Sequence, residues 1–151
     1  MPAAGLAGYR QFHVGIAVVR IGAFLMGSTL TPLSGVRILV VDDFDDGREV
    51  LRQILAHYGA TVTTASSARE ALAGLDELDV IVTDYSMPGD TGLWLLERVR
   101  ERGRSLPIIV LTGYAERQAA ELRKAPFARV LRKPVDPWAL CEEIRGVLGL
   151  D

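Results

Sequence analysis

The stretch Val36-Arg37-Ile38-Leu39-Val40-Val41-Asp42-Asp43 joins a short apolar run to a pair of carboxylates. Similar apolar runs recur along the chain at Thr61–Thr64, Val80–Thr83, Ile108–Leu111 and Val130–Leu131. Several of them are β-branched and continuous rather than alternating, which is typical of strands buried on both faces of a parallel sheet. The sequence therefore predicts five buried strands.

Segments with helical spacing lie between and after these runs. Their markers are Asp46–Tyr58 closed by Gly59, the Ser67/Glu70 capping pair, Leu93, Leu96 and Val99 after a start at Asp90 or Thr91, Glu116–Lys124, and the Asp136-Pro137 start with a stripe at Leu140, Cys141, Ile144, Val147 and Leu148. Strands that alternate with helices form doubly wound α/β sheets with right-handed crossovers. Working sites in such sheets lie at the carboxyl ends of the strands, so chemically active residues are expected directly after the apolar runs.

The bulk composition limits the class of protein. The 151 residues suit one domain, and 49% hydrophobic and 24% charged residues are ordinary for a globular chain. The net charge of −2 provides no global field for nucleic acid or an anionic membrane, so neither is expected as a partner. The lone Cys141 excludes an intramolecular disulfide and fits a reducing compartment, so we expect a cytoplasmic protein with this thiol in its core.

Residues 1–35 differ in composition from the rest of the chain. They contain no Asp or Glu, and all 19 acidic residues lie after Val36. Their apolar stretch, Val14–Met26, is shorter than the roughly 20 residues of a membrane-spanning helix and carries Arg20 at its centre. We expect residues 1–35 to be a flexible leader and linker, or the product of a misassigned start codon, and residues 36–151 to be the folded domain.

Polar side chains follow four of the five predicted strands. Asp42 and Asp43 follow the first strand, Asp84 the third, Thr112 the fourth and Lys133 the fifth. Three carboxylates crowded together repel one another and raise each other's pKa, and a divalent cation removes that conflict. A ligand set made only of oxygen suits Mg²⁺, so the sequence predicts a magnesium site at the carboxyl ends of the strands.

Four segments together carry a resemblance to a known family. They are Val40–Asp43 (VVDD), Thr83–Gly89 (TDYSMPG), Val110–Gly113 (VLTG) and Lys133-Pro134 (KP). In order and spacing they resemble the signature segments of the bacterial response-regulator receiver family, and the resemblance extends from Val36 to about Leu150. It implies a flavodoxin-like, doubly wound sheet of five parallel strands in the order 2-1-3-4-5, with helices on both faces.

The resemblance also implies a role for each residue at the strand ends. Asp84 matches the position of the family's phosphoacceptor, and a carboxylate there could form an acyl phosphate without a base. The Mg²⁺ site would be formed by Asp43, Asp84 and the main-chain carbonyl of Ser86, with Asp42 acting through bound water. The phosphoryl oxygens would be stabilised by Thr112, the Gly113 N–H and Lys133, and Pro134 suggests a cis Lys133–Pro134 bond.

One position departs from the family pattern. Three residues before the lysine, many members carry Tyr or Phe, an aromatic that turns inward on phosphorylation. Here that residue is Val130, which has no ring to move. Phe127 and Tyr114 are the nearby candidates for a substitute.

The resemblance predicts a phosphorylation switch in a two-component system or phosphorelay, and not an enzyme acting on other molecules. A sensor histidine kinase or a histidine phosphotransfer protein is the expected donor, with an unidentified protein as output target and a homodimer as an option. Because the chain ends at Asp151, directly after the last predicted helix, we expect a stand-alone regulator. A receiver fragment of a hybrid histidine kinase and a phosphate sink are the open alternatives.

Two other classes fit the architecture less well. A flavodoxin-like cofactor binder needs a Ser/Thr/Gly-rich phosphate cradle after the first strand. The chain instead has Asp42-Asp43-Phe44-Asp45-Asp46 there, which would repel a bare phosphate. A small-molecule aspartyl phosphatase would need a cap that encloses its substrate, and the sequence pattern shows none.

Overall fold

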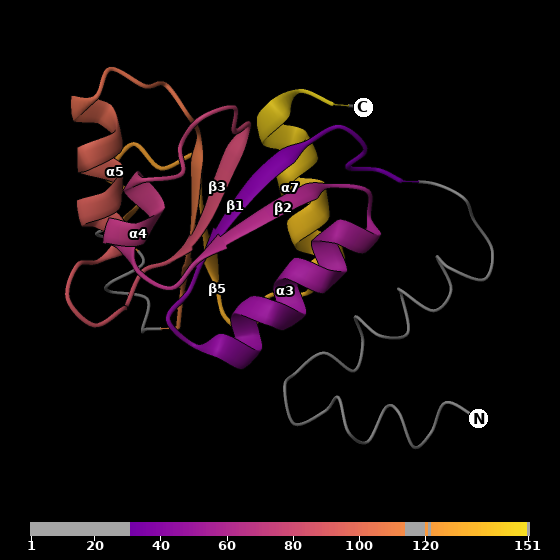
Figure 1. Cartoon of the computed structure of the whole chain (residues 1–151), viewed down its shortest axis with the longest axis horizontal. Helices are drawn as coiled ribbons and strands as arrows, with labels where there is room; N and C mark the ends of the chain where they lie inside the picture. Colours follow the sequence, from indigo (N-terminus) through magenta and orange to yellow (C-terminus); the bar gives the residue numbers. More distant parts are fainter. Residues whose placement is uncertain (1–30, 114–119, 121, 151) are drawn as a thin grey trace.

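A five-stranded parallel sheet forms the centre of the computed structural model, which describes residues 31–113, 120 and 122–150. The strands are β1 (Arg37–Val41), β2 (Thr61–Ala65), β3 (Val80–Asp84), β4 (Ile108–Thr112) and β5 (Arg129–Arg132). The helices are α3 (Asp45–His57), α4 (Ala68–Leu72), α5 (Gly92–Glu101) and α7 (Pro137–Leu148). The strand order is β2-β1-β3-β4-β5, and Figure 1 shows helices on both sides of the sheet. The predicted fold class and strand order are confirmed.

The alternation of side chains along the strands divides the core into two parts. In β1, Ile38 and Val40 belong to one hydrophobic cluster, and Leu39 belongs to the other. The first cluster is completed by α3 and α7, and the second by α4 and α5. Both faces of β1, β3 and β4 are therefore covered, which explains why their sequences are continuously apolar.

Side-chain caps set the starts of two helices. The Asp136 carboxylate accepts a hydrogen bond from the Trp138 N–H at 3.3 Å at the start of α7. The Thr91 hydroxyl accepts one from the Trp94 N–H at 3.2 Å at the start of α5. A polar oxygen at the N-cap satisfies a helix N–H that has no partner within the helix. The sequence predicted the cap at Asp136 and left two choices for α5, of which Thr91 is the one used.

The capping pair before α4 differs from its expected geometry. The Ser67 hydroxyl accepts from the Glu70 N–H at 3.0 Å, as the pattern predicts. The Glu70 carboxylate, however, accepts from the N–H and the hydroxyl of Ser66 rather than from Ser67. These bonds to Ser66 stabilise the carboxylate and lower the pKa of Glu70.

The residues just before β1 are part of the folded unit, although the sequence predicted a linker there. Leu33 is fully buried in the core beside α3 and α7, and its N–H donates to the Tyr58 carbonyl at 2.9 Å. Arg145 of α7 donates from Nη1 to the Pro32 carbonyl at 2.6 Å. Among the described residues, packing against the core therefore includes Pro32 and Leu33, which precede the boundary expected at residue 36.

One predicted helix cannot be compared with the structure, and the buried face of another differs in part from the prediction. The helix expected over Glu116–Lys124 lies largely outside the described residues, as do Tyr114 and residues 1–30. On α5 the buried stripe contains Leu95 in addition to Leu96 and Val99, while Leu93 is only partly buried. Within the described ranges, no helix has the length and apolar character needed to cross a membrane.

A close approach between α5 and β3 makes Gly92 a sensitive position. A Cβ placed on Gly92 would lie 2.9 Å from the Asp84 carbonyl oxygen, which is main chain and cannot turn aside. We expect Gly92→Ala to lower the free energy of unfolding by about 1–3 kcal/mol, as other overpacked positions do. Thermal unfolding followed by circular dichroism measures the change.

Gly74→Ala is the matched control for this substitution. At Gly74 the nearest atom to an added Cβ is the Ala71 carbonyl oxygen at 4.0 Å, an ordinary contact. We expect the control to unfold at or above the temperature of the unsubstituted chain. An equal loss of stability in both variants would show that the approach of α5 to β3 is not the cause.

Candidate functional site

Three carboxylates from two neighbouring strands meet at the carboxyl ends of the sheet. Asp42 and Asp43 follow β1, and Asp84 is the last residue of β3, which pairs with β1. One oxygen from each of the three lies within 4.8 Å of the other two. Ligands at the roughly 2.1 Å distance of Mg²⁺ are about 3–4 Å apart, and all the donors are oxygen. The residues present therefore fit a magnesium ion with little movement.

Burial gives Asp84 a different environment from the other two acids. Its side chain is mostly buried, whereas Asp43 is exposed. Loss of solvation raises the pKa of Asp84, and the negative charges of Asp42 and Asp43 raise it further. The Lys133 ammonium opposes both effects, because its Nζ lies 2.9 Å from the Asp84 Oδ1. A second cation beside Asp84 would, like Lys133, lower the pKa of Asp84.

Lys133 connects the ends of three strands. Its side chain forms the ion pair with Asp84 of β3, and its own N–H donates to the carbonyl of Thr112, the last residue of β4, at 2.8 Å. The residue itself follows β5, and the Lys133–Pro134 peptide bond is cis. The structure thus brings the lysine together with the acidic cluster, and Thr112 lies fully buried beside its main chain.

The remaining predicted site residues lie around this centre. Ser86 is exposed in the loop after β3, and Gly113 is exposed directly after β4. Val130 is partly buried in β5, opposite Val110 of β4. Phe127, one proposed substitute for the missing aromatic, packs partly buried against the α4–α5 core.

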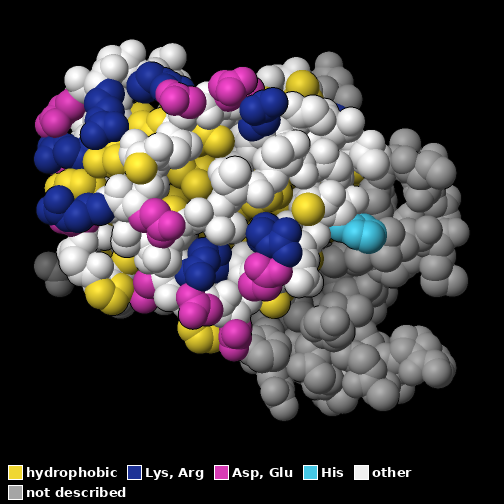
Figure 2. Space-filling view, viewed as in Figure 1, with side chains coloured by type: hydrophobic (Ala, Val, Ile, Leu, Met, Phe, Trp, Pro, Cys, Tyr) yellow, Lys and Arg dark blue, Asp and Glu magenta, His cyan; other side chains and the backbone are white. Residues whose placement is uncertain are grey.

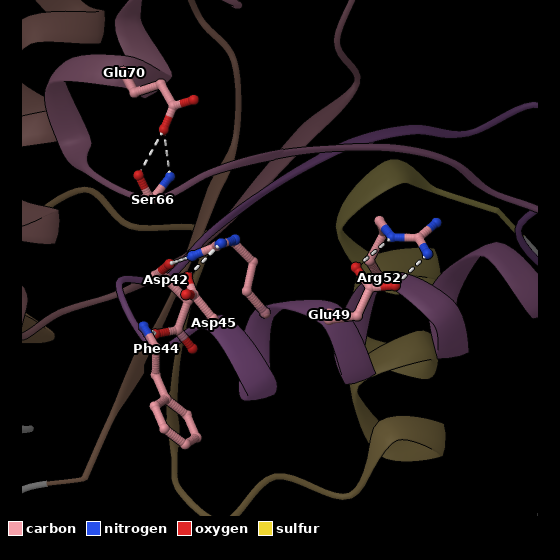
Figure 3. A network of polar contacts seen from close by, with 8 residues as sticks. Asp42, Phe44, Asp45, Glu49, Arg52, Ser66 and Glu70 are labelled. Atoms are coloured by element: carbon pink, nitrogen blue, oxygen red, sulfur yellow. Dashed lines mark hydrogen bonds and ion pairs between the residues drawn. The ribbon is translucent and has the colours of Figure 1, made fainter.

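The sequence prediction missed a contact that holds the loop after β1. Arg48, in the first turn of α3, donates from Nη1 to the Asp42 carbonyl at 2.8 Å and from Nη2 to the Asp45 carboxylate at 2.6 Å. The Asp42 carboxylate accepts from the Phe44 N–H at 2.9 Å, and Figure 3 shows Asp42, Phe44 and Asp45 close together. The available signal was the i,i+3 spacing of Asp45 and Arg48, which favours an ion pair on a helix.

An apolar cleft adjoins the acidic cluster between α3 and the segment leading into α7. Its volume is about 600 Å³, and its lining includes Leu51, Pro134 and Val135, with Asp42 and Lys133 at the polar end. Phe44 also lines it and is 57% exposed, although large apolar side chains are seldom so exposed. Figure 2 shows acidic side chains at the lower edge of the molecule, where α3 begins.

The fold and the site together define a flavodoxin-like α/β protein with an acidic pair, a buried aspartate and a lysine at the carboxyl ends of its strands. Residues 38–145 match the family model of the response regulator receiver domain. The chain belongs to this family, and this part of it is the receiver domain of a two-component response regulator. The predicted family resemblance is confirmed.

Known proteins from several bacteria are similar to this chain. An uncharacterized 14.6 kDa protein from Leptolyngbya boryana is 47% identical over 72% of this chain and 86% of its own length. Chemotaxis protein CheY from Pseudomonas aeruginosa is 37% identical over 74% of this chain and 94% of its own length. Transcriptional regulatory protein FixJ from Azorhizobium caulinodans is 40% identical, and this chain matches 54% of FixJ.

Solved structures support the same assignment. A receiver domain from Clostridium thermocellum superposes with a TM-score of 0.70 at 29% identity, over 76% of this chain and 94% of that one. The response regulator TrrA from Thermotoga maritima, solved in complex with Mg²⁺ and BeF, superposes with a TM-score of 0.68 at 30% identity, over 75% of this chain and 99% of TrrA.

Proposed function

We propose that Asp84 accepts a phosphoryl group in a magnesium-dependent reaction and that the modified domain changes its contacts with other proteins. The observation that carries the proposal is the meeting of four charged side chains at one point. The Asp84 carboxylate lies in a cluster with Asp42 and Asp43 and forms an ion pair with Lys133 at 2.9 Å.

The chemical step needs no base in the protein. A lone pair of the Asp84 carboxylate forms a bond to phosphorus, and the bond between phosphorus and the donor atom breaks. The donor group leaves with that electron pair, as acetate does when acetyl phosphate is the donor. Burial favours this step, because a carboxylate that is poorly solvated has less water to shed before it reacts.

The other site residues serve to stabilise charge on the phosphoryl oxygens. Magnesium, held by Asp42, Asp43, Asp84 and the Ser86 main-chain carbonyl, supplies positive charge there when bound. Lys133 pairs with the same oxygens after transfer, and Thr112 with the Gly113 N–H donates hydrogen bonds from the end of β4. The bond from the Lys133 N–H to the Thr112 carbonyl supports this role, because it keeps the two residues side by side.

The phosphoryl donor in the cell is a histidine kinase or a histidine phosphotransfer protein. Support comes from the family, and from the apolar cleft that opens beside Asp42 and Lys133 with the exposed Phe44 on its lining. Apolar surface next to a reactive group gives a protein donor an area to bury. Output then passes to a second protein that distinguishes the two states of the domain.

Removal of the metal tests the proposal directly. With acetyl phosphate and millimolar Mg²⁺, we expect intact-mass spectrometry to show one added phosphoryl group per chain. With excess EDTA we expect no adduct, because the acidic cluster and the incoming phosphoryl oxygens then repel one another. Restoring Mg²⁺ in excess over EDTA is the control, and an adduct that forms equally well in EDTA would rule out a magnesium-dependent acceptor.

A further inference from the structure

We infer that Arg48 is a positioning residue for the metal site, which fixes the main chain at Asp42 and so holds the acidic loop in the geometry that binds Mg²⁺. The inference rests on the proposed function and deepens it. Arg48 is not among the residues that would touch the ion or the phosphoryl group, and its contribution passes through Asp42.

Within residues 31–113 and 122–150, three hydrogen bonds hold Asp42, and one of them depends on Arg48. The Asp42 N–H donates to the Ala65 carbonyl at 3.1 Å, which only continues the pairing of β1 with β2. Beyond the strand, the Asp42 carboxylate accepts from the Phe44 N–H at 2.9 Å, and the Asp42 carbonyl accepts from the Arg48 Nη1 at 2.8 Å. Within the described part of the chain, Arg48 is therefore the side chain that bonds to the main chain of Asp42.

Both terminal nitrogens of the Arg48 guanidinium form hydrogen bonds, and together these bonds fix its orientation. Nη1 reaches the Asp42 carbonyl at 2.8 Å, while Nη2 pairs with the Asp45 carboxylate at 2.6 Å. The Arg48 side chain is 20% exposed, so its bond to the Asp42 carbonyl is partly shielded from water, whereas the Asp45 side chain is 83% exposed. A planar fork that binds two acceptors at once fixes an orientation that a single ammonium cannot.

The same helix offers a matched control one turn further on. Arg52 pairs with Glu49 through the same i,i+3 relation, but it is 39% exposed and its hydrogen bonds reach only that side chain. Figure 3 shows Glu49 and Arg52 apart from Asp42 and Asp45. Arg48→Ala and Arg52→Ala therefore remove the same charge from α3, and only Arg48→Ala releases the Asp42 main chain.

Charge and positioning have opposite effects on metal affinity. Removing a guanidinium near the site reduces repulsion of a cation, so a purely electrostatic role predicts tighter Mg²⁺ binding in both variants. Loss of positioning weakens binding, because residues that orient metal ligands typically contribute about 10–100-fold to affinity. The sign of the change in Kd for Mg²⁺ thus separates the two roles.

Isothermal titration of the full chain with MgCl₂ tests the inference, with thermal unfolding measured in parallel. We expect Arg48→Ala to raise the Kd for Mg²⁺ about tenfold and Arg52→Ala to leave it within about twofold. Arg48→Lys should recover only part of the loss, because lysine restores the charge without the fork. If Arg48→Ala does not fold, the comparison of Arg48→Lys with Arg52→Lys decides in the same way.

A double-mutant cycle tests whether Asp45 is the residue that orients the Arg48 guanidinium. Asp45→Asn removes the carboxylate that orients the fork, so its effect on Kd and that of Arg48→Ala should be less than additive. Unchanged or tighter Mg²⁺ binding in Arg48→Ala overturns the inference while leaving the proposed function intact. An absence of Mg²⁺ binding in the unsubstituted chain overturns the proposed function, and the inference with it.

Discussion

Asp84→Asn should abolish the phosphoryl adduct formed from acetyl phosphate and Mg²⁺. The amide nitrogen and oxygen have no lone pair nucleophilic enough to replace the carboxylate, and no other carboxylate in the described residues combines the burial of Asp84 with a lysine at 2.9 Å. Intact-mass spectrometry measures the adduct, and peptide mapping after borohydride trapping locates it. An adduct of equal yield in Asp84→Asn would show that the acceptor lies elsewhere.

The fold of the same variant serves as its control, and its pH dependence has a defined sign. Burial raises the pKa of Asp84, so the folded chain binds this proton more tightly than the unfolded chain. Stability from this group is therefore greatest below the unfolded pKa and is lost as the pH rises through the folded pKa. At pH 7 without metal, we expect Asp84→Asn to unfold at a higher temperature than the unsubstituted chain, with the difference shrinking in acid.

Lys133→Ala should slow phosphoryl uptake by about 100-fold while leaving a folded domain. Loss of one preorganised charge or donor at a site of developing negative charge typically costs 10²–10³ in rate. In the absence of metal, the ammonium also opposes the effect of burial on the pKa of Asp84, and its Nζ lies 2.9 Å from the Asp84 Oδ1. The rate of adduct formation at saturating Mg²⁺, measured by quenched samples and intact mass, gives the effect.

Arg100→Ala provides the charge control for Lys133→Ala. Arg100 is exposed on α5, a helix that supplies none of the proposed metal or phosphoryl contacts, and its removal changes the net charge by the same amount. We expect its uptake rate to match the unsubstituted chain within about twofold. Similar slowing in both variants would mean that overall charge, rather than the contact with Asp84, governs the rate.

The sequence was sufficient to predict the fold because local and long-range signals agree. The apolar runs are buried on both faces in β1, β3 and β4, and their ends deliver Asp42, Asp84 and Thr112 to one side of the sheet. Parallel pairing aligns those ends without further information. For the same reason the sequence alone predicts that Asp42, Asp43, Asp84 and Lys133 meet.

Contacts that depend on tertiary packing were not predictable in this way. Leu33 stands among polar and turn residues, and only the space beside Tyr58 explains its burial. The role of Arg48 was not predictable, because every residue has a main-chain carbonyl and no sequence pattern shows which one an arginine binds. Leu95 was missed because the interpretation of α5 followed i,i+3 spacing alone, whereas the buried face also includes the i,i+4 position.

The burial of Leu33 shows that the packed core extends beyond the residues that match the family model. The family model matches residues 38–145, yet the cluster formed with α3 and α7 also includes Leu33, Val36, Val147 and Leu148. A recombinant piece cut at the limits of the match would lose side chains from both ends of one hydrophobic cluster. Deleting a buried leucine alone costs roughly 2–5 kcal/mol, a large part of the stability of a small domain. Work on this domain in isolation should therefore retain the chain from Thr31 through Leu150.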